Sequence, residues 1–193
     1  MTKIFQSLLY TIIAGFMLLI LIVAVASPGL ELSHAWGIFF MRWLHVLSAV
    51  MWVGLLWYFN FVQIPSMPKI PDEQKPAISK VIAPEALFWF RYAALATVVT
   101  GLLVATMNGY ISGALSLTPP FLAIGIGMWI ALIMAFNVWF IIWPNQQKAL
   151  GMIEVTIEEK ATAGKIAMLT SRANTLLSIP MLYMMVAQSH GGF

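Results

Sequence analysis

Residues 34–63 read HAWGIFFMRWLHVLSAVMWVGLLWYFNFVQ. The ionisable side chains in this stretch are Arg42, His34 and His45, and most of the remaining residues are apolar. A helix needs about 20 mostly apolar residues to cross a hydrocarbon core of about 30 Å, so this stretch has residues to spare for tilt or projection. Because lipid offers no hydrogen-bond partner to an open backbone, we expect a transmembrane helix here.

The same pattern recurs in the rest of the chain. Further apolar stretches lie at about 4–26, 85–108, 119–143 and 167–188, and a proline-rich loop, which we expect to be cytoplasmic, covers 64–84. The sequence therefore predicts one all-α integral membrane domain over residues 1–193, a bundle of five transmembrane helices. Thr156 and Glu159 have the spacing of a capping box at the start of the helix that leads into the fifth span.

The composition excludes several classes of protein. Hydrophobic residues make up 61% of the chain and charged residues only 9%, whereas a soluble domain carries about 25% charged residues. This excludes a water-soluble enzyme, and a net charge of +3 without a basic block argues against a nucleic-acid partner. The chain has no cysteine, which excludes disulfides, iron–sulfur clusters and covalent haem attachment.

The lysines predict the orientation. They lie before the first span, between the second and third, and between the fourth and fifth: Lys3; Lys69, Lys75 and Lys80; Lys148, Lys160 and Lys165. With five spans, all of these segments share one side of the membrane, and the opposite side has no Lys or Arg. The positive-inside rule then places the N-terminus inside and the C-terminus outside, as expected for a bacterial-type inner membrane protein.

Arg42 and His45 form the most informative pair inside a span. They are three residues apart and share one helix face, and His45 lies near mid-membrane. This pattern suits haem b, with His45 on the iron and Arg42 on a propionate. The alternative is a histidine bonded to a neighbouring helix, with Arg42 extending towards the outer interface.

The sequence offers three candidates for a second axial ligand of the haem iron. Met128, Met134 and Met181 lie at a depth comparable to His45. If none of them binds, the iron is five-coordinate. His34 and His190 lie at matching depth near the outer surface. They are candidates for binding a metal or a second haem, or they are simply solvated.

A larger polar cluster is predicted in the inner half of the bundle. Its members are Asn60, Gln63, Glu85, Arg91, Asn137, Asn145, Gln146, Arg172 and Asn174. Glu85 pairing with Arg91 or Arg172 would hold the bundle together. Alternatively, the two arginines line a cavity for an anionic ligand, and the sequence does not choose between these interpretations.

Several motifs resemble those of one known family. They are Arg42-Trp-Leu-His45, Met51-Trp-Val-Gly54, Glu85-Ala-Leu-Phe-Trp-Phe-Arg91 and Asn137-Val-Trp-Phe-Ile-Ile-Trp-Pro-Asn-Gln-Gln-Lys148. Together they resemble the membrane domain of the cytochrome c-type urate oxidases. The resemblance implies a helical membrane domain that carries out an oxidation, with His45 as a haem or site residue. It also implies electron transfer to a cytochrome c domain outside the membrane.

Departures from this family shape the expected function. We expect the protein to lack the C-terminal cytochrome c domain. Phe61 and Ala173 stand where the family has histidines, and Gln63 stands where it has an acidic residue. We therefore expect a haem b protein that relays electrons or serves as a membrane subunit beside a separate cytochrome c or oxidase complex, or that self-associates. The alternatives are a haem-free structural subunit and a small metal-handling or transport protein.

Overall fold

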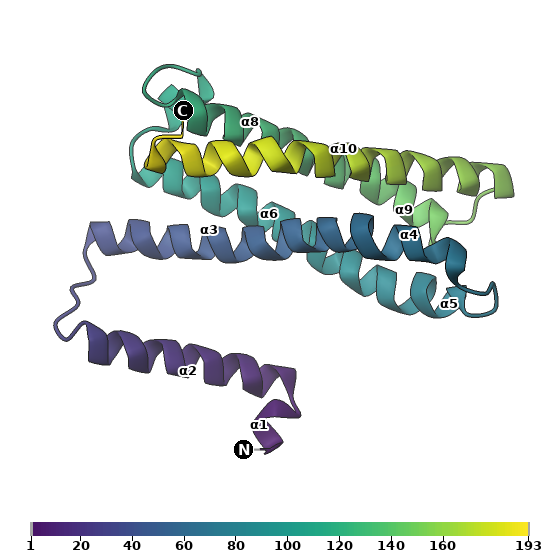
Figure 1. Ribbon diagram of the computed structural model, residues 1–193, viewed down its shortest axis with the longest axis horizontal. Coiled ribbons are helices and arrows are strands. Elements are labelled where there is room, and N and C mark those ends of the chain that lie inside the picture. Colours follow the sequence, from purple (N-terminus) through teal and green to yellow (C-terminus); the bar gives the residue numbers. More distant parts are fainter. Residues whose placement is uncertain (1, 193) are drawn as a thin grey trace. The chain divides into compact units, whose positions relative to one another are not determined.

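A computed structural model describes residues 2–192, and every regular element among them is helical (Figure 1). In chain order the elements are α1 (Thr2–Phe5), α2 (Leu8–Ala26), α3 (His34–Trp57), η1 (Tyr58–Gln63), α4 (Ile64–Ser66), η2 (Met67–Lys69), α5 (Lys75–Ala77), η3 (Ile78–Ile82), α6 (Ala83–Met107), α7 (Ile111–Leu115), α8 (Leu122–Phe136), η4 (Asn137–Ile142), α9 (Trp143–Ala149) and α10 (Ile157–His190). The segments η1, η3 and η4 are π-helical. The prediction of an all-α fold is confirmed.

Four helical stretches in the described part of the chain are long and apolar enough to cross a membrane: Leu8–Ala26, His34–Lys69, Lys75–Met107 and Leu122–Ala149. They agree with the first four predicted spans. The helix α10 is not among them. Its predicted span, 167–188, includes Arg172, Asn174 and several hydroxyl side chains, which lower its hydropathy.

The chain divides into two compact units, one ending at Gly37 and one beginning at Ile38. Within the first unit, α2 has no buried residue. At 1.5 Å per residue its 19 residues are about 28 Å long, close to the thickness of a hydrocarbon core. The second unit holds α6, α8, α10 and most of α3, and contains all the core described below.

The second unit has two ends, which we name by their contents. The lysine end holds the connections at 64–82 and 150–156, and the C-terminal end holds the connection at 108–121 together with His190. The main hydrophobic core extends towards the lysine end, where Trp52, Leu56 and Phe90 are almost completely buried. The predicted capping box is confirmed: the Glu159 backbone N–H donates to the Thr156 hydroxyl, and the Thr156 backbone N–H donates to the Glu159 carboxylate.

Amide side chains join the helices towards the lysine end. Asn174 on α10 is fully buried and donates to the carbonyl of Met134 on α8 at 3.0 Å. Asn137 donates in turn to the Asn174 side-chain oxygen at 2.8 Å. Three residues earlier on α10, the Ser171 hydroxyl accepts from Asn60 of η1 at 2.8 Å. These bonds fix α10 against both η1 and the α8–η4 helix.

We expect Asn174→Ala to lower the free energy of unfolding by about 1–2 kcal/mol, because it leaves Asn137 and a buried carbonyl without their partner. Thermal unfolding in detergent measures the loss as a drop of a few degrees in the midpoint. The matched control is Asn145→Ala, since Asn145 donates within the continuous η4–α9 helix, to the carbonyl of Ile141 at 2.8 Å. Equal shifts in the two variants would contradict the proposed role of Asn174 as the joint between helices.

Candidate functional site

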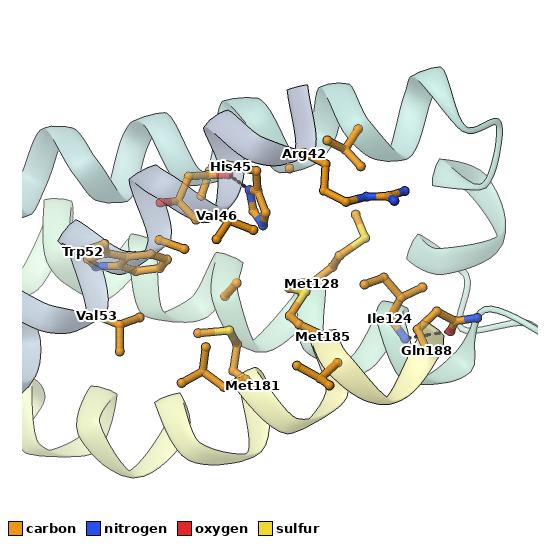
Figure 2. Close-up of a pocket in the computed structure, with 18 of the residues that line it drawn as sticks. Arg42, His45, Val46, Trp52, Val53, Ile124, Met128, Met181, Met185 and Gln188 are labelled. Atoms are coloured by element: carbon orange, nitrogen blue, oxygen red, sulfur yellow. Dashed lines mark hydrogen bonds between the residues drawn. The ribbon is translucent and has the colours of Figure 1, made fainter. Parts of the chain in front are cut away.

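A cavity of about 710 Å³ lies in the second unit, between α3, α6, α8 and α10 (Figure 2). Its walls are mainly apolar, and ligand sites in proteins commonly enclose about 300–1,000 Å³. Trp52 and Val53, both buried, line it towards the lysine end. The polar side chains Arg42, Tyr110, Gln188 and His190 lie towards its C-terminal end. The cavity is therefore apolar in its depth and polar at one end.

His45 lines this cavity and is held by the neighbouring helix α6. Its Nδ1 lies 2.9 Å from the carbonyl oxygen of Thr97 and 3.3 Å from the Thr100 hydroxyl. A carbonyl only accepts, so Nδ1 carries the hydrogen and donates it. In the neutral ring, Nε2 then has a free lone pair, the state in which histidine binds metals. Figure 2 shows the ring directed into the cavity, opposite methionine side chains of α8 and α10.

Gly101, one turn further along α6, packs directly against the His45 ring. A Cβ placed on Gly101 would lie 2.8 Å from Cε1 and 3.1 Å from Nδ1 of His45, closer than side chains tolerate. Only glycine therefore lets α6 approach the imidazole this closely. Together, Thr97 and Gly101 hold one rotamer of His45, one turn of helix apart.

Arg42 lines the cavity one turn from His45, as their spacing predicts, and its side chain is exposed. Burial raises the pKa of Tyr110, and the nearby positive charge of Arg42 only partly opposes this. Gln188 closes the gap between α8 and α10: it accepts from the Ile124 backbone N–H at 3.1 Å and donates to the Pro120 carbonyl at 3.0 Å.

The three methionines predicted as second ligands have different environments. Met128 and Met181 line the cavity, whereas Met134 is fully buried in the core and does not reach it. Met185 lines the cavity too. Met185 was not among the predicted ligands, although its position four residues after Met181 places both on one helix face.

His34 and His190, predicted near the outer surface, are both exposed. His190 lines the cavity, and its Nδ1 donates to the Val186 carbonyl at 3.1 Å. His34 is the first residue of α3 and belongs to the first unit. Among the described residues, no group of three or more His, Cys, Asp or Glu side chains is placed to hold a metal ion.

The predicted inner cluster does not form one site. The Glu85 carboxylate accepts from the Trp89 indole at 2.9 Å, and Arg172 is exposed. In the described part of the chain, Lys75–Asp72 at 2.6 Å is the one ion pair, so Glu85 pairs with neither Arg91 nor Arg172. Among residues 2–192 the amide bonds described above, rather than an ion-pair network, therefore connect the helices at this end.

Three members of this cluster, Arg91, Gln63 and Gln146, have environments of their own. The Arg91 guanidinium stacks on the Trp143 ring, 3.3 Å from its centroid, and its buried Nε and Nη1 find no hydrogen-bond partner among the described residues. Gln63 and Gln146 line a second, small cavity of about 40 Å³. A cavity of this size holds a water molecule but not an organic anion.

The fold and the cavity define a helical protein of the multi-pass membrane type with an internal ligand-sized space. Residues 120–192, from just before α8 to the end of α10, match the family described as urate oxidase N-terminal. The match covers this part of the chain, which includes the Asn137–Lys148 motif, and confirms there the resemblance to this family. No curated protein and no solved structure matches the chain.

We expect Gly101→Ala to displace the His45 ring, because the new methyl group overlaps Cε1, and to break the bond from Nδ1 to Thr97. Nitrogen NMR of the protein with labelled histidine measures this directly, since the chain has only three histidines. The expected result is a changed Nδ1 signal for His45. Gly54→Ala is the control, because Gly54 also lines the cavity but a Cβ at this position would meet no atom within 4 Å. An unchanged signal in Gly101→Ala would contradict the close packing.

Proposed function

We propose that this chain is a membrane-embedded redox protein that binds haem b in the large cavity, with His45 as the axial ligand. The observation that carries the proposal is the state of His45: Nδ1 is bonded to Thr97, which leaves Nε2 available beside a cavity of about 710 Å³. The match of residues 120–192 to the urate oxidase N-terminal family supports an oxidoreductase role.

The residues around the cavity fit such a group. His45 would supply the ligand nitrogen, and its bond to the Thr97 carbonyl raises the electron density of the ring and fixes its direction. Arg42 and Tyr110 would hold anionic propionates at the C-terminal end, where charge stays hydrated. The apolar walls exclude water from the depth of the cavity. Haem, when bound, supplies the one-electron chemistry that protein side chains lack.

A thioether is the candidate for the other side of the iron. Met128, Met181 and Met185 line the wall opposite His45, and methionine is an established haem ligand. Met134 is excluded from this role by its place in the packed core.

We further propose that α10 is a fifth transmembrane helix, with the N-terminus inside and the C-terminus outside a bacterial-type inner membrane. It packs along α8, η4 and α9, which lie within one apolar span, so the two must share the same depth. Its polar residues Ser171, Asn174 and Ser178 are buried against other helices rather than exposed to lipid. The protein would then exchange electrons with a separate cytochrome c or oxidase complex at the outer surface.

A haem-free structural subunit is the second candidate. It is favoured by the amide bonds that join α10 to its neighbours towards the lysine end, because helix association alone explains them. It does not explain why His45 faces a large cavity.

The absorption spectrum of the purified protein tests the cofactor. We expect a Soret band that is lost in His45→Ala and kept in His34→Ala. Arg42→Ala should retain the band but weaken haem binding about tenfold, because one charge-assisted bond is lost at an exposed position. A colourless protein that takes up no added haem would contradict the haem proposal and favour the structural subunit.

Cysteine labelling tests the fifth span, and the chain offers a cysteine-free background. We expect Gly192→Cys to react with an impermeant maleimide added outside intact cells. Glu73→Cys, in the loop between η2 and α5, should react only after permeabilisation. Reaction of both from the same side would show that α10 does not cross the membrane.

A further inference from the structure

Arg91 is a cation on α6 to which no described residue supplies a counter-charge. Only 9% of its surface is exposed. Within residues 2–192, the one ion pair joins Lys75 to Asp72. The acidic side chain closest to Arg91 in the sequence is Glu85, and its carboxylate accepts from the Trp89 indole at 2.9 Å. A cation that has left water is costly unless an anion lies beside it, so the environment of Arg91 calls for an anion from outside the described chain.

The contact with Trp143 fixes the guanidinium but accepts no hydrogen bond from its edges. Cζ of Arg91 lies 3.3 Å from the centroid of the Trp143 ring, so the stack occupies one face of the guanidinium. Nε and Nη1 are buried without a partner among the described residues, and the exposed remainder leaves Nη2 as the nitrogen that a ligand can reach. Arg91 is therefore a fixed cation with a free donor at the surface.

A second donor without a partner lies at the same helix junction. Trp139 is one turn before Trp143, and its buried indole N–H has no partner among residues 2–192. Its ring packs edge-on against Tyr92, with the centroids 5.7 Å apart. Tyr92 follows Arg91 directly, so both contacts join the same turn of α6 to η4 and α9. Arginine and tryptophan side chains only donate, which favours an oxyanion as the ligand.

The level of Arg91 along α6 is that of a membrane interface. Arg91 is eight residues after Ala83, about 12 Å from the start of the helix at the lysine end. Beside it, Trp89 and Tyr92 have 50% and 47% of their surface exposed. Exposed tryptophan and tyrosine gather where hydrocarbon meets the head groups, and nearby lysines attract negatively charged lipids. The oxyanion within reach at this level is the phosphate of a lipid.

We propose that Arg91, held by Trp143, binds the phosphate of an anionic phospholipid in the leaflet at the lysine end. A phosphate oxygen accepts from Nη2 and supplies the missing negative charge, while an acyl chain lies along exposed Leu95, one turn deeper on α6. A net negative lipid is favoured over a zwitterionic one, whose head group already carries a cation. Neither Arg91 nor Trp143 lines the large cavity, so this site is separate from the proposed haem site and does not depend on it.

Native mass spectrometry of the protein in detergent tests the binding, because it resolves each bound lipid. The probes are phosphatidylglycerol and phosphatidylcholine with identical acyl chains, which share a phosphate but differ in net charge. We expect the first phosphatidylglycerol to bind about tenfold more tightly than the first phosphatidylcholine, the effect of one charge-assisted contact. Equal affinities in the wild-type protein would overturn the proposal without any variant.

Matched arginine variants assign the site. Arg91→Gln should weaken the first phosphatidylglycerol about tenfold and abolish the preference over phosphatidylcholine. Arg172→Gln is the control, because it removes the same charge from an exposed position on α10. We expect this control to keep the preference. Equal losses in the two variants would overturn the proposal and show that lipid responds to the overall charge of the protein.

Trp143→Leu provides a second variant in case Arg91→Gln does not fold. It keeps the positive charge but removes the ring that holds the guanidinium, so we expect severalfold weaker binding of phosphatidylglycerol. Unchanged binding in a folded Trp143→Leu protein would overturn the proposal.

Inorganic phosphate distinguishes the source of the oxyanion. Added in large excess, it should leave the bound phosphatidylglycerol in place, because it lacks the acyl chains. A phosphate adduct that replaces the lipid and is lost in Arg91→Gln would show a site for the free anion and overturn the lipid proposal. Haem binding at His45 is measured separately by the Soret band, so neither result depends on the other.

Discussion

The hydrogen bond from His45 Nδ1 to the Thr97 carbonyl is the interaction on which the site depends. It joins α3 to α6 at the cavity wall and satisfies a carbonyl in α6 that also accepts from Thr100. More importantly, it decides which ring nitrogen carries the hydrogen, and so which nitrogen faces the cavity with a lone pair. Without this bond, the same imidazole in the same helix could present a donor instead of a ligand.

The second unit is closely packed towards the lysine end and open around the cavity. Towards the lysine end, Asn60, Asn137 and Asn174 place their amides against partners on other helices, and the core packs around them. Around the cavity, Ala49 and Gly54 of α3 put little volume into the space between the helices, so the walls stand apart. Firm attachment at one end lets the other end stay open without the helices separating.

The helices could be predicted from the sequence, but the contacts between them could not. Long apolar runs predicted the four candidate spans and the shared face of Arg42 and His45, because both follow from local periodicity. Thr97 and Gly101 lie more than fifty residues from His45, and no local pattern links them. For the same reason, the sequence did not separate Asn174, which joins helices, from Asn145, which bonds within its own segment. The π-helical segments at 58–63 and 137–142 also had no local signal.

The distribution of charge in the cavity limits how any ligand can lie in it. A carboxylate or carbonyl placed against buried Trp52 and Val53 would lose water and find little in exchange, at a cost of several kcal/mol. Beside Arg42, which is exposed, the same group keeps part of its hydration and gains a cation. The polar end of a bound molecule must therefore point to the C-terminal end, and its apolar body must lie against the methionines. His45, one turn deeper than Arg42, then faces the middle of that body rather than its edge.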